Sequence, residues 1–133
     1  MSANGSVSLV WAGGEDVFCL SKVGLILDLE DKCKAGIGII AGRLESGSYG
    51  LNDIRETIRL GLIGGGATPE RAMASVRNHV DGNPLSHSVL VAYAVVRAVL
   101  FGTPVDDPVG KQEPEATENP GSTMTTDASV DLK

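Results

Sequence analysis

The chain has 133 residues, a length that allows one domain with a modest hydrophobic core. Apolar residues make up 42% of it, as in ordinary soluble globular proteins, and aromatic residues only 4%, so the core must consist mainly of Leu, Ile, Val and Ala. The formal net charge of −6 argues against a nucleic-acid-binding protein that neutralises phosphates.

The first predicted element is a β-hairpin over residues 6–20. In its first half Val7, Leu9 and Trp11 alternate with Ser6, Ser8 and Val10, Gly13 and Gly14 supply a turn, and the apolar residues 17–20 return. Helical patterns follow up to residue 101. The expected fold class is therefore mainly α, with an N-terminal hairpin followed by about five short helices.

The helix starts are predicted from capping residues. Ser21 is the expected cap of the first helix, and Thr68 caps the best-marked one, with Pro69 at its first position and Glu70 in its first turn. The helices are expected over residues 22–34, 35–45, from about 52 to the glycines at 64–66, 69–80 and 86–101.

The third helical segment ends in three consecutive glycines. Residues 53–68 read DIRETIRLGLIGGGAT, in which Ile54, Ile58 and Leu62 repeat every four residues. A phosphate-binding loop of the Walker type would need a strand before the glycines and a lysine after them, and neither is present. We therefore expect a helix end in which Gly64 takes the left-handed conformation and the next glycines let the chain reverse in a close-packed corner.

No residue pattern predicts catalytic chemistry, and we expect no enzyme activity, cofactor or metal. Residues 36–41 match G-x-G-x-x-A, but a polar helical segment stands where a dinucleotide site needs a strand. His79 and His87 lie near no nucleophile and are expected to be solvated or capping residues. Cys19 and Cys33 lack metal or redox spacing and are expected to be buried free thiols.

The last helical segment, residues 86–101, is apolar on nearly every face. Because a small domain cannot cover such a helix alone, we expect one stripe to face a partner or a second copy of the chain. That stripe is predicted to contain Val91, Val95 and Val99, while Arg97 reaches solvent. The stripe assigned to the domain core contains Leu85, Val89, Tyr93, Val96 and Leu100. The longest apolar run, residues 89–96, is too short to cross a bilayer, so no membrane partner is expected.

Composition changes after Gly102. Residues 103–133 hold four of the six prolines, seven acidic residues, two basic residues and no aromatic residue. Such a segment cannot bury enough apolar surface to offset its ordering entropy. The predicted organisation is therefore a folded domain, 1–102, and a disordered acidic tail, 103–133.

Residues 51–66, LNDIRETIRLGLIGGG, resemble the core motif of the tail assembly chaperones of gene transfer agents and related siphophages, which are also described as tail tube proteins. Residues 5–29 are similar to the family's N-terminal hairpin and first helix. Residues 39–44, the segment Asn83-Pro84-Leu85 and the final apolar helix are similar too, so the resemblance covers about residues 5–102. The tail is not part of the family pattern. The motif residues that we carry over are Arg55, Glu56, Ile58, Arg59, Leu60, Gly61, Leu62, Ile63, Gly64, Gly65 and Gly66.

The resemblance implies a non-enzymatic role in the cytoplasm of a bacterial host. Such chaperones bind the long, helical tape measure protein before the tail polymerises and keep it soluble until tube subunits replace them. The implied partners are therefore the tape measure protein and the tail tube subunit. The alternative is a structural component of the tail tube or tail end, which should be rich in strands and self-assembling.

Overall fold

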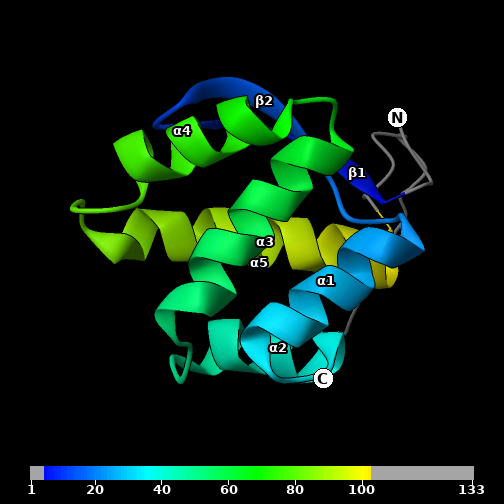
Figure 1. Cartoon of the computed structure of the whole chain (residues 1–133). Coiled ribbons are helices and arrows are strands. Elements are labelled where there is room, and N and C mark those ends of the chain that lie inside the picture. The colour runs from blue at the N-terminus through cyan, green and yellow to red at the C-terminus, as the bar shows by residue number, and fades with distance from the viewer. Residues whose placement is uncertain (1–4, 103–133) are drawn as a thin grey trace, which may run out of the picture.

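The computed structural model describes residues 5–102; residues 1–4 and 103–133, which include the predicted acidic tail, lie outside that part. Within it, five helices follow an antiparallel hairpin, so the predicted mainly α fold class is confirmed (Figure 1). The elements are β1 (Ser6–Trp11), β2 (Gly14–Cys19), α1 (Val23–Cys33), α2 (Ile37–Ser46), α3 (Leu51–Gly64), α4 (Pro69–His79) and α5 (Leu85–Phe101).

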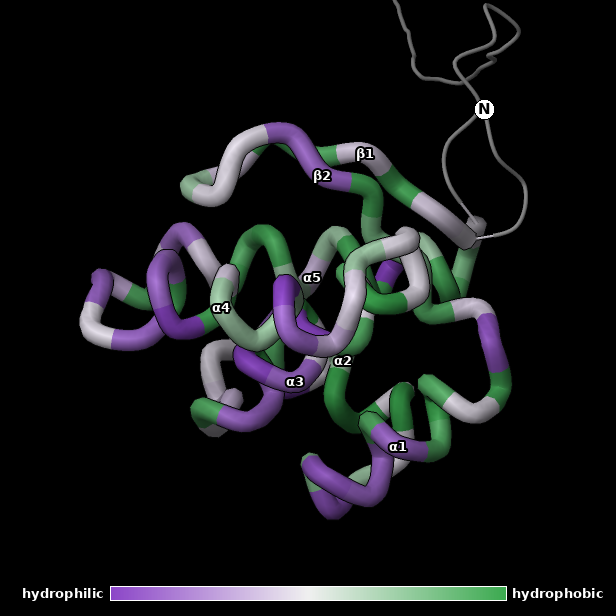
Figure 2. The backbone as a smooth tube through the Cα atoms, turned by 45° about the horizontal axis from the view of Figure 1, so that its top comes forward, coloured by the Kyte–Doolittle hydropathy of each residue, from purple (hydrophilic) through white to green (hydrophobic). Residues whose placement is uncertain are grey.

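The hairpin lies over one side of the helices (Figures 1 and 2). Its register places Trp11 opposite Gly14 beside the turn. Trp11 and Phe18 are buried and meet edge to face, with ring centroids 5.7 Å apart. Val10 and Val17 point outward and are 78% and 45% exposed. The alternation of the strands thus separates a face packed on the helices from a face open to solvent.

α3 is the central helix. It contacts β2, α1, α4 and α5, and Figure 1 shows it crossing in front of α5. Because α3 is packed on several sides, its buried residues occupy more than one stripe. The predicted core positions Ile54, Ile58 and Leu62 are all 1% exposed or less. Hydrophilic residues gather instead along α4 and in the C-terminal half of α1 (Figure 2).

The helix ends lie within two residues of their predicted positions. Thr68 is confirmed as a cap, because its Oγ1 accepts a hydrogen bond from the Arg71 N–H at 3.1 Å. Ser21 does not cap α1, whose N-cap is Lys22 and which makes no side-chain cap bond. Lys34 ends α1 in the left-handed conformation, with φ 57°, so the next helix begins at Ile37, two residues later than expected.

Candidate functional site

The glycine motif joins the end of α3 to the backbone of β2. A Cβ on Gly64 would lie 1.7 Å from the Cys19 carbonyl oxygen, and one on Gly65 would lie 1.9 Å from the Val17 carbonyl oxygen. Each glycine instead directs a Cα hydrogen toward the carbonyl oxygen, and close Cα–H···O contacts between backbones are mildly favourable. The two glycines face carbonyl oxygens, which repel a phosphate. The close-packed corner is therefore confirmed, with β2 as the element packed against it.

The predicted conformation of Gly64 is wrong. Gly64 is the last residue of α3, and its cap Gly65 has φ −83° and ψ −2°, within the right-handed region. The positive φ of 117° falls on Gly66, where the chain turns toward α4. Gly64 and Gly65 are thus required for space, and only Gly66 is required for its backbone conformation.

Gly61 extends the same contact one turn earlier in α3. A Cβ there would lie 3.0 Å from Val95 Cγ1 of α5 and 3.3 Å from Phe18 Cδ2 of β2. The neighbouring apolar motif residues Ile58, Leu60 and Leu62 are buried, and Ile63 is half-buried. This half of the motif builds the meeting point of β2, α3 and α5.

The charged motif residues form ion pairs. Arg55 Nε and Nη2 donate to the two carboxylate oxygens of Asp81 at 2.8 and 3.1 Å, which joins α3 to the loop before α5. Arg59 Nη2 donates to Glu56 Oε1 at 2.6 Å within α3. Glu56 is buried, and its partner arginine satisfies it there. These side chains hold the fold together, which is the role that the geometry assigns to them.

Two further buried carboxylates carry structural contacts that the sequence analysis missed. Asp53, at 2% exposure, accepts hydrogen bonds from Arg43 Nη1 at 3.1 Å and from the Gly50 N–H at 2.7 Å, so it both starts α3 and joins it to α2. Asp16 accepts from Trp11 Nε1 at 2.9 Å and from Arg71 Nη2 at 2.7 Å, which joins the hairpin to α4. The strand alternation that places Asp16 on the face of Phe18 was the available signal.

The pKa of Asp16 lies below its ordinary value. Burial raises the pKa of this carboxyl, but the hydrogen bonds from Arg71 and Trp11 and the charge of Arg71 outweigh that effect. Asp16 therefore stays ionised and holds both partners.

α5 is rotated about its axis relative to the prediction. Val91 and Val95 are 5% and 0% exposed and Val99 is half-buried, so the prediction that this stripe faces a partner is wrong. Val96 is buried as predicted, but Leu100 is 37% exposed. The reason is the contact at Gly61, where the missing side chain on α3 makes room for Val95.

A different stripe of α5 is open. It consists of Leu90, Ala94, Arg97 and Phe101, spaced by four, three and four residues, and we call it the α5 stripe. Leu90 is 67% exposed and Phe101 is 71% exposed, whereas Ala94 is half-buried. The Arg97 guanidinium lies over two aromatic rings, 5.1 Å from the Phe101 centroid and 5.8 Å from that of Tyr93. These contacts hold the arginine against an apolar surface.

Two hollows flank the α5 stripe. The β1-side hollow, of about 260 Å³, is lined by Val7 of β1, by residues of α5 that include Leu90 and Arg97, and by Gly102 after the helix. The α2-side hollow, of about 360 Å³, is lined by Gly38, Gly42 and Glu45 of α2 and also reaches Arg97. A Cβ on Gly38 or Gly42 would meet no atom within 4 Å, so this part of α2 is open. Together they widen the α5 stripe into a shallow apolar surface.

The histidines lie on another side of the domain. His79 and His87 line a hollow of about 260 Å³. The His79 ring packs edge to face on Trp11, with centroids 5.8 Å apart, so His79 is a packing residue, whereas His87 is exposed. Within residues 5–102, no group of three or more His, Cys, Asp or Glu side chains is placed to hold a metal. No helix of that part has the length and apolarity to cross a membrane.

Both cysteines are buried free thiols, as predicted. Burial raises the pKa of the Cys33 thiol to about 12, and its contact with Asp53 adds to the shift. Cys33 therefore remains protonated at neutral pH and is a poor nucleophile.

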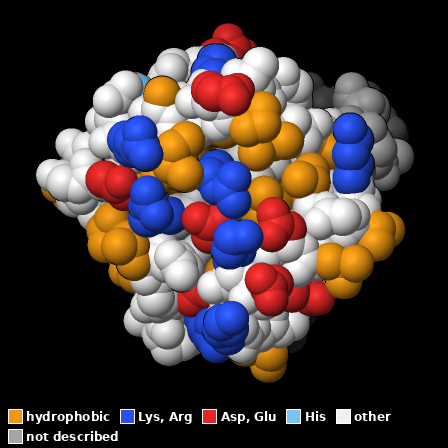
Figure 3. Space-filling view, in the orientation of Figure 1, with side chains coloured by type: hydrophobic (Ala, Val, Ile, Leu, Met, Phe, Trp, Pro, Cys, Tyr) orange, Lys and Arg blue, Asp and Glu red, His pale blue; other side chains and the backbone are white. Residues whose placement is uncertain are grey.

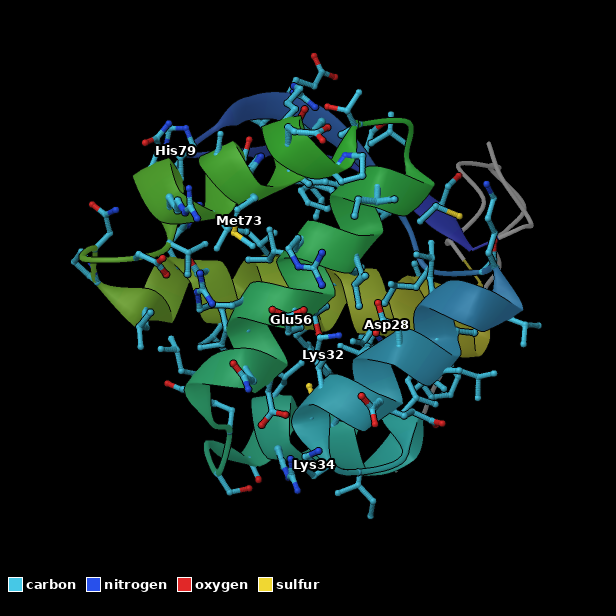
Figure 4. The ribbon with its side chains drawn as sticks, in the orientation of Figure 1. Asp28, Lys32, Lys34, Glu56, Met73 and His79 are labelled. Carbon is cyan, nitrogen blue, oxygen red and sulfur yellow. The ribbon has the colours of Figure 1, made fainter. Side chains whose placement is uncertain are left out.

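The face formed by α1, α3 and α4 carries intermixed charges with apolar side chains between them. Figure 3 shows Lys and Arg side chains beside Asp and Glu on this face, with hydrophobic side chains around them. Figure 4 places Asp28, Lys32 and Glu56 close together where α1 meets α3, and Lys32 Nζ donates to Asp28 Oδ1 at 2.9 Å. Intermixed charges of this kind suit a solvated surface, which leaves the α5 stripe as the stronger candidate for a partner.

The comparisons with known proteins agree with the expected family. A family model described as phage tail tube protein, GTA-gp10, matches residues 4–102, a range that includes all of the described residues 5–102. No curated protein matches the chain, and no solved structure does. The resemblance to a gene transfer agent and phage tail family is confirmed. The chain therefore belongs to the family described as phage tail tube protein, GTA-gp10, and it is a phage tail component.

Proposed function

We propose that the protein is a non-enzymatic tail assembly chaperone, which binds the tape measure protein and keeps it soluble before the tail tube polymerises. The observation that carries the proposal is the α5 stripe, in which the exposed apolar residues Leu90 and Phe101 flank the half-buried Ala94 and the charged Arg97. The site of action would be the cytoplasm of a bacterial host, where tails are assembled.

The spacing of the α5 stripe suits a helical partner. Residues spaced by four, three and four form a straight seam along a helix, and such seams pair with the apolar face of a second helix. The small residues Gly38 and Gly42 of α2 border the seam and would let a partner backbone approach closely. A long helical protein such as the tape measure protein offers faces of this kind.

The charged residues support a binding role rather than catalysis. The buried carboxylates Asp16, Asp53 and Glu56 each accept a hydrogen bond from an arginine, and these pairs join elements of the fold or stiffen α3. A general acid or base needs a carboxylate that can exchange its proton with a substrate, whereas each of these three carboxylates is held by an arginine.

A second candidate is a structural component of the tail tube or tail end, and the family description favours it. The outer face of the hairpin supplies a surface on which copies could associate, because Val10 and Val17 are exposed on it. The small share of strand in residues 5–102 counts against a tube wall built from this domain alone.

Co-expression with the tape measure protein tests the first proposal. Leu90→Asp should leave the domain folded, because Leu90 is exposed, but should abolish recovery of soluble tape measure protein. Leu27→Asp is the matched control, since Leu27 is 59% exposed on α1, outside the α5 stripe, and should preserve recovery. If Leu90→Asp keeps the tape measure protein soluble, the proposal is wrong. Rings or filaments of the pure protein in negative-stain images would favour the second candidate.

A further inference from the structure

The two edges of the hairpin are not equivalent. In an antiparallel pair, residues that exchange hydrogen bonds alternate with residues whose N–H and C=O groups point away from the partner strand. Trp11 lies opposite Gly14 across a two-residue turn, and the pair that flanks such a turn is hydrogen-bonded. The next hydrogen-bonded residue of β1 is therefore Leu9. Ser8 and Val10 lie on either side of Leu9 and turn their backbone groups away from β2.

The outer edge of β2 meets the end of α3. By the same alternation, Val17 and Cys19 direct their carbonyl oxygens away from β1, and these are the oxygens against which Gly65 and Gly64 pack. The positions of the glycines thus support the assignment of outward-facing residues independently of the turn. A further strand could reach these groups of β2 only by displacing the end of α3.

The edge of β1 has no such cover within residues 5–102. Val10 is 78% exposed, Ser8 is exposed as well, and no backbone hydrogen bond outside the hairpin involves either residue in that part of the chain. The β1-side hollow lies beside this strand, with Val7 on its wall. Natural edge strands are commonly protected by a charged residue, a proline or a bulge, whereas β1, SVSLVW, has no charge or proline and pairs without a bulge. The edge of β1 can therefore accept another strand.

The β1 strand of a second copy fits this edge. A two-fold axis at Leu9 would place Ser8 of each copy opposite Val10 of the other, and the two pairs would exchange about four hydrogen bonds. The two Leu9 side chains would meet on the face that packs on the helices, where Leu9 and Val7 are only half-buried by their own chain. Because β1 carries no charge, the two strands would bring no like charges together.

We propose that two copies of the chain pair along β1, with Ser8 opposite Val10, and join their hairpins into one antiparallel sheet. Both outer strands of that sheet are β2, whose outer edge meets α3. Strand pairing therefore stops at the dimer and does not continue into a filament. The pairing does not rest on the proposed function, since it uses no contact with the tape measure protein.

Amide hydrogen exchange of the full chain, measured by NMR over a range of protein concentrations, tests the pairing. The Ser8 and Val10 amides should exchange rapidly in the dilute monomer and roughly ten-fold more slowly once about nine-tenths of the chains are dimeric, because their N–H groups then donate hydrogen bonds. The Val17 amide is the control, since it points away from β1, and its exchange should change little. The proposal is wrong if the Ser8 and Val10 amides stay unprotected at the highest concentration. It is also wrong if their protection is the same at every concentration, because the chain itself would then cover the edge.

Introduced charges test the register of the two strands. Ser8→Lys with Val10→Lys puts like charges opposite each other in both pairs, and should weaken the dimer roughly ten-fold or more in analytical ultracentrifugation. Ser8→Glu with Val10→Lys is the matched control, because it puts a carboxylate opposite an ammonium group in both pairs and should preserve the dimer. Both variants should keep the circular dichroism spectrum of the wild-type protein, since both side chains are exposed.

The difference between the two variants carries the test. The lysine pair reduces the net negative charge of the chain, so general repulsion between copies cannot explain a loss of the dimer in that variant. If both variants dimerise as tightly as the wild-type protein, or if the control dissociates as readily as the lysine pair, the strands do not meet in this register and the proposal is wrong.

Discussion

Replacing Gly64 with alanine tests the contact on which the corner between α3 and β2 depends. The new Cβ would lie 1.7 Å from the Cys19 carbonyl oxygen and 2.9 Å from Leu25 Cδ1. The leucine side chain can move aside, but the carbonyl belongs to the backbone of β2. The hairpin must therefore separate from α3 by more than an ångström, or the last turn of α3 must unwind.

The expected loss of stability is large for the addition of one methyl group. Overpacking a core costs about 1–3 kcal/mol, and a clash with backbone belongs at or above the upper end of that range. Alanine is favoured over glycine within a helix by roughly 1 kcal/mol, which offsets part of the loss. We expect the free energy of unfolding to fall by roughly 2 kcal/mol or more, a substantial share of the stability of a small domain.

Urea unfolding followed by circular dichroism measures this change, and Gly42→Ala is its matched control. Gly42 lies inside α2, and a Cβ there would meet no atom within 4 Å. The same substitution should therefore stabilise the protein by roughly 0.5–1 kcal/mol. If Gly64→Ala is as stable as the wild-type protein, α3 does not approach β2 this closely and the explanation of the motif fails.

Three further predictions follow from buried side chains. Val95→Asp should destabilise the domain by roughly 4 kcal/mol or more, because it buries an unpaired carboxylate, whereas Leu90→Asp should change the unfolding midpoint little. Because the pKa of Asp16 is lower in the folded state than in the unfolded state, its ionised form stabilises the fold fully above the unfolded pKa, and this stabilisation is lost as the pH falls below about 4 toward the folded pKa. In the Asp16→Asn variant, the free energy of unfolding should therefore fall less steeply as the pH is lowered. The Cys33 thiol, with its pKa raised to about 12, should react with a disulfide reagent only as fast as the protein unfolds, and rapid labelling of the native protein at neutral pH would contradict its burial.

The local signals in the sequence were sufficient to predict the elements. The Thr68-Pro69 start of α4 and the alternation in the hairpin each act over a few residues, and both appear as expected. The role of Gly64 depends instead on β2, which lies more than forty positions earlier in the chain. A helix end with a left-handed glycine and a helix end pressed on a strand have the same local pattern, so the pattern could not separate them.

The orientation of α5 could not be predicted for the same reason, because it too depends on a contact with a distant element. Its apolar residues surround the helix, so hydrophobicity alone selects no inward side. The buried side is fixed where Val95 meets Gly61, a contact between α5 and α3. One local signal was nevertheless present, because Arg97 is the charged residue of α5, and Leu90, Ala94 and Phe101 share its side at spacings of seven, three and four residues. An arginine that must reach solvent brings its helical neighbours to the surface with it, and on α5 those neighbours are the apolar residues that the proposed function assigns to a partner helix.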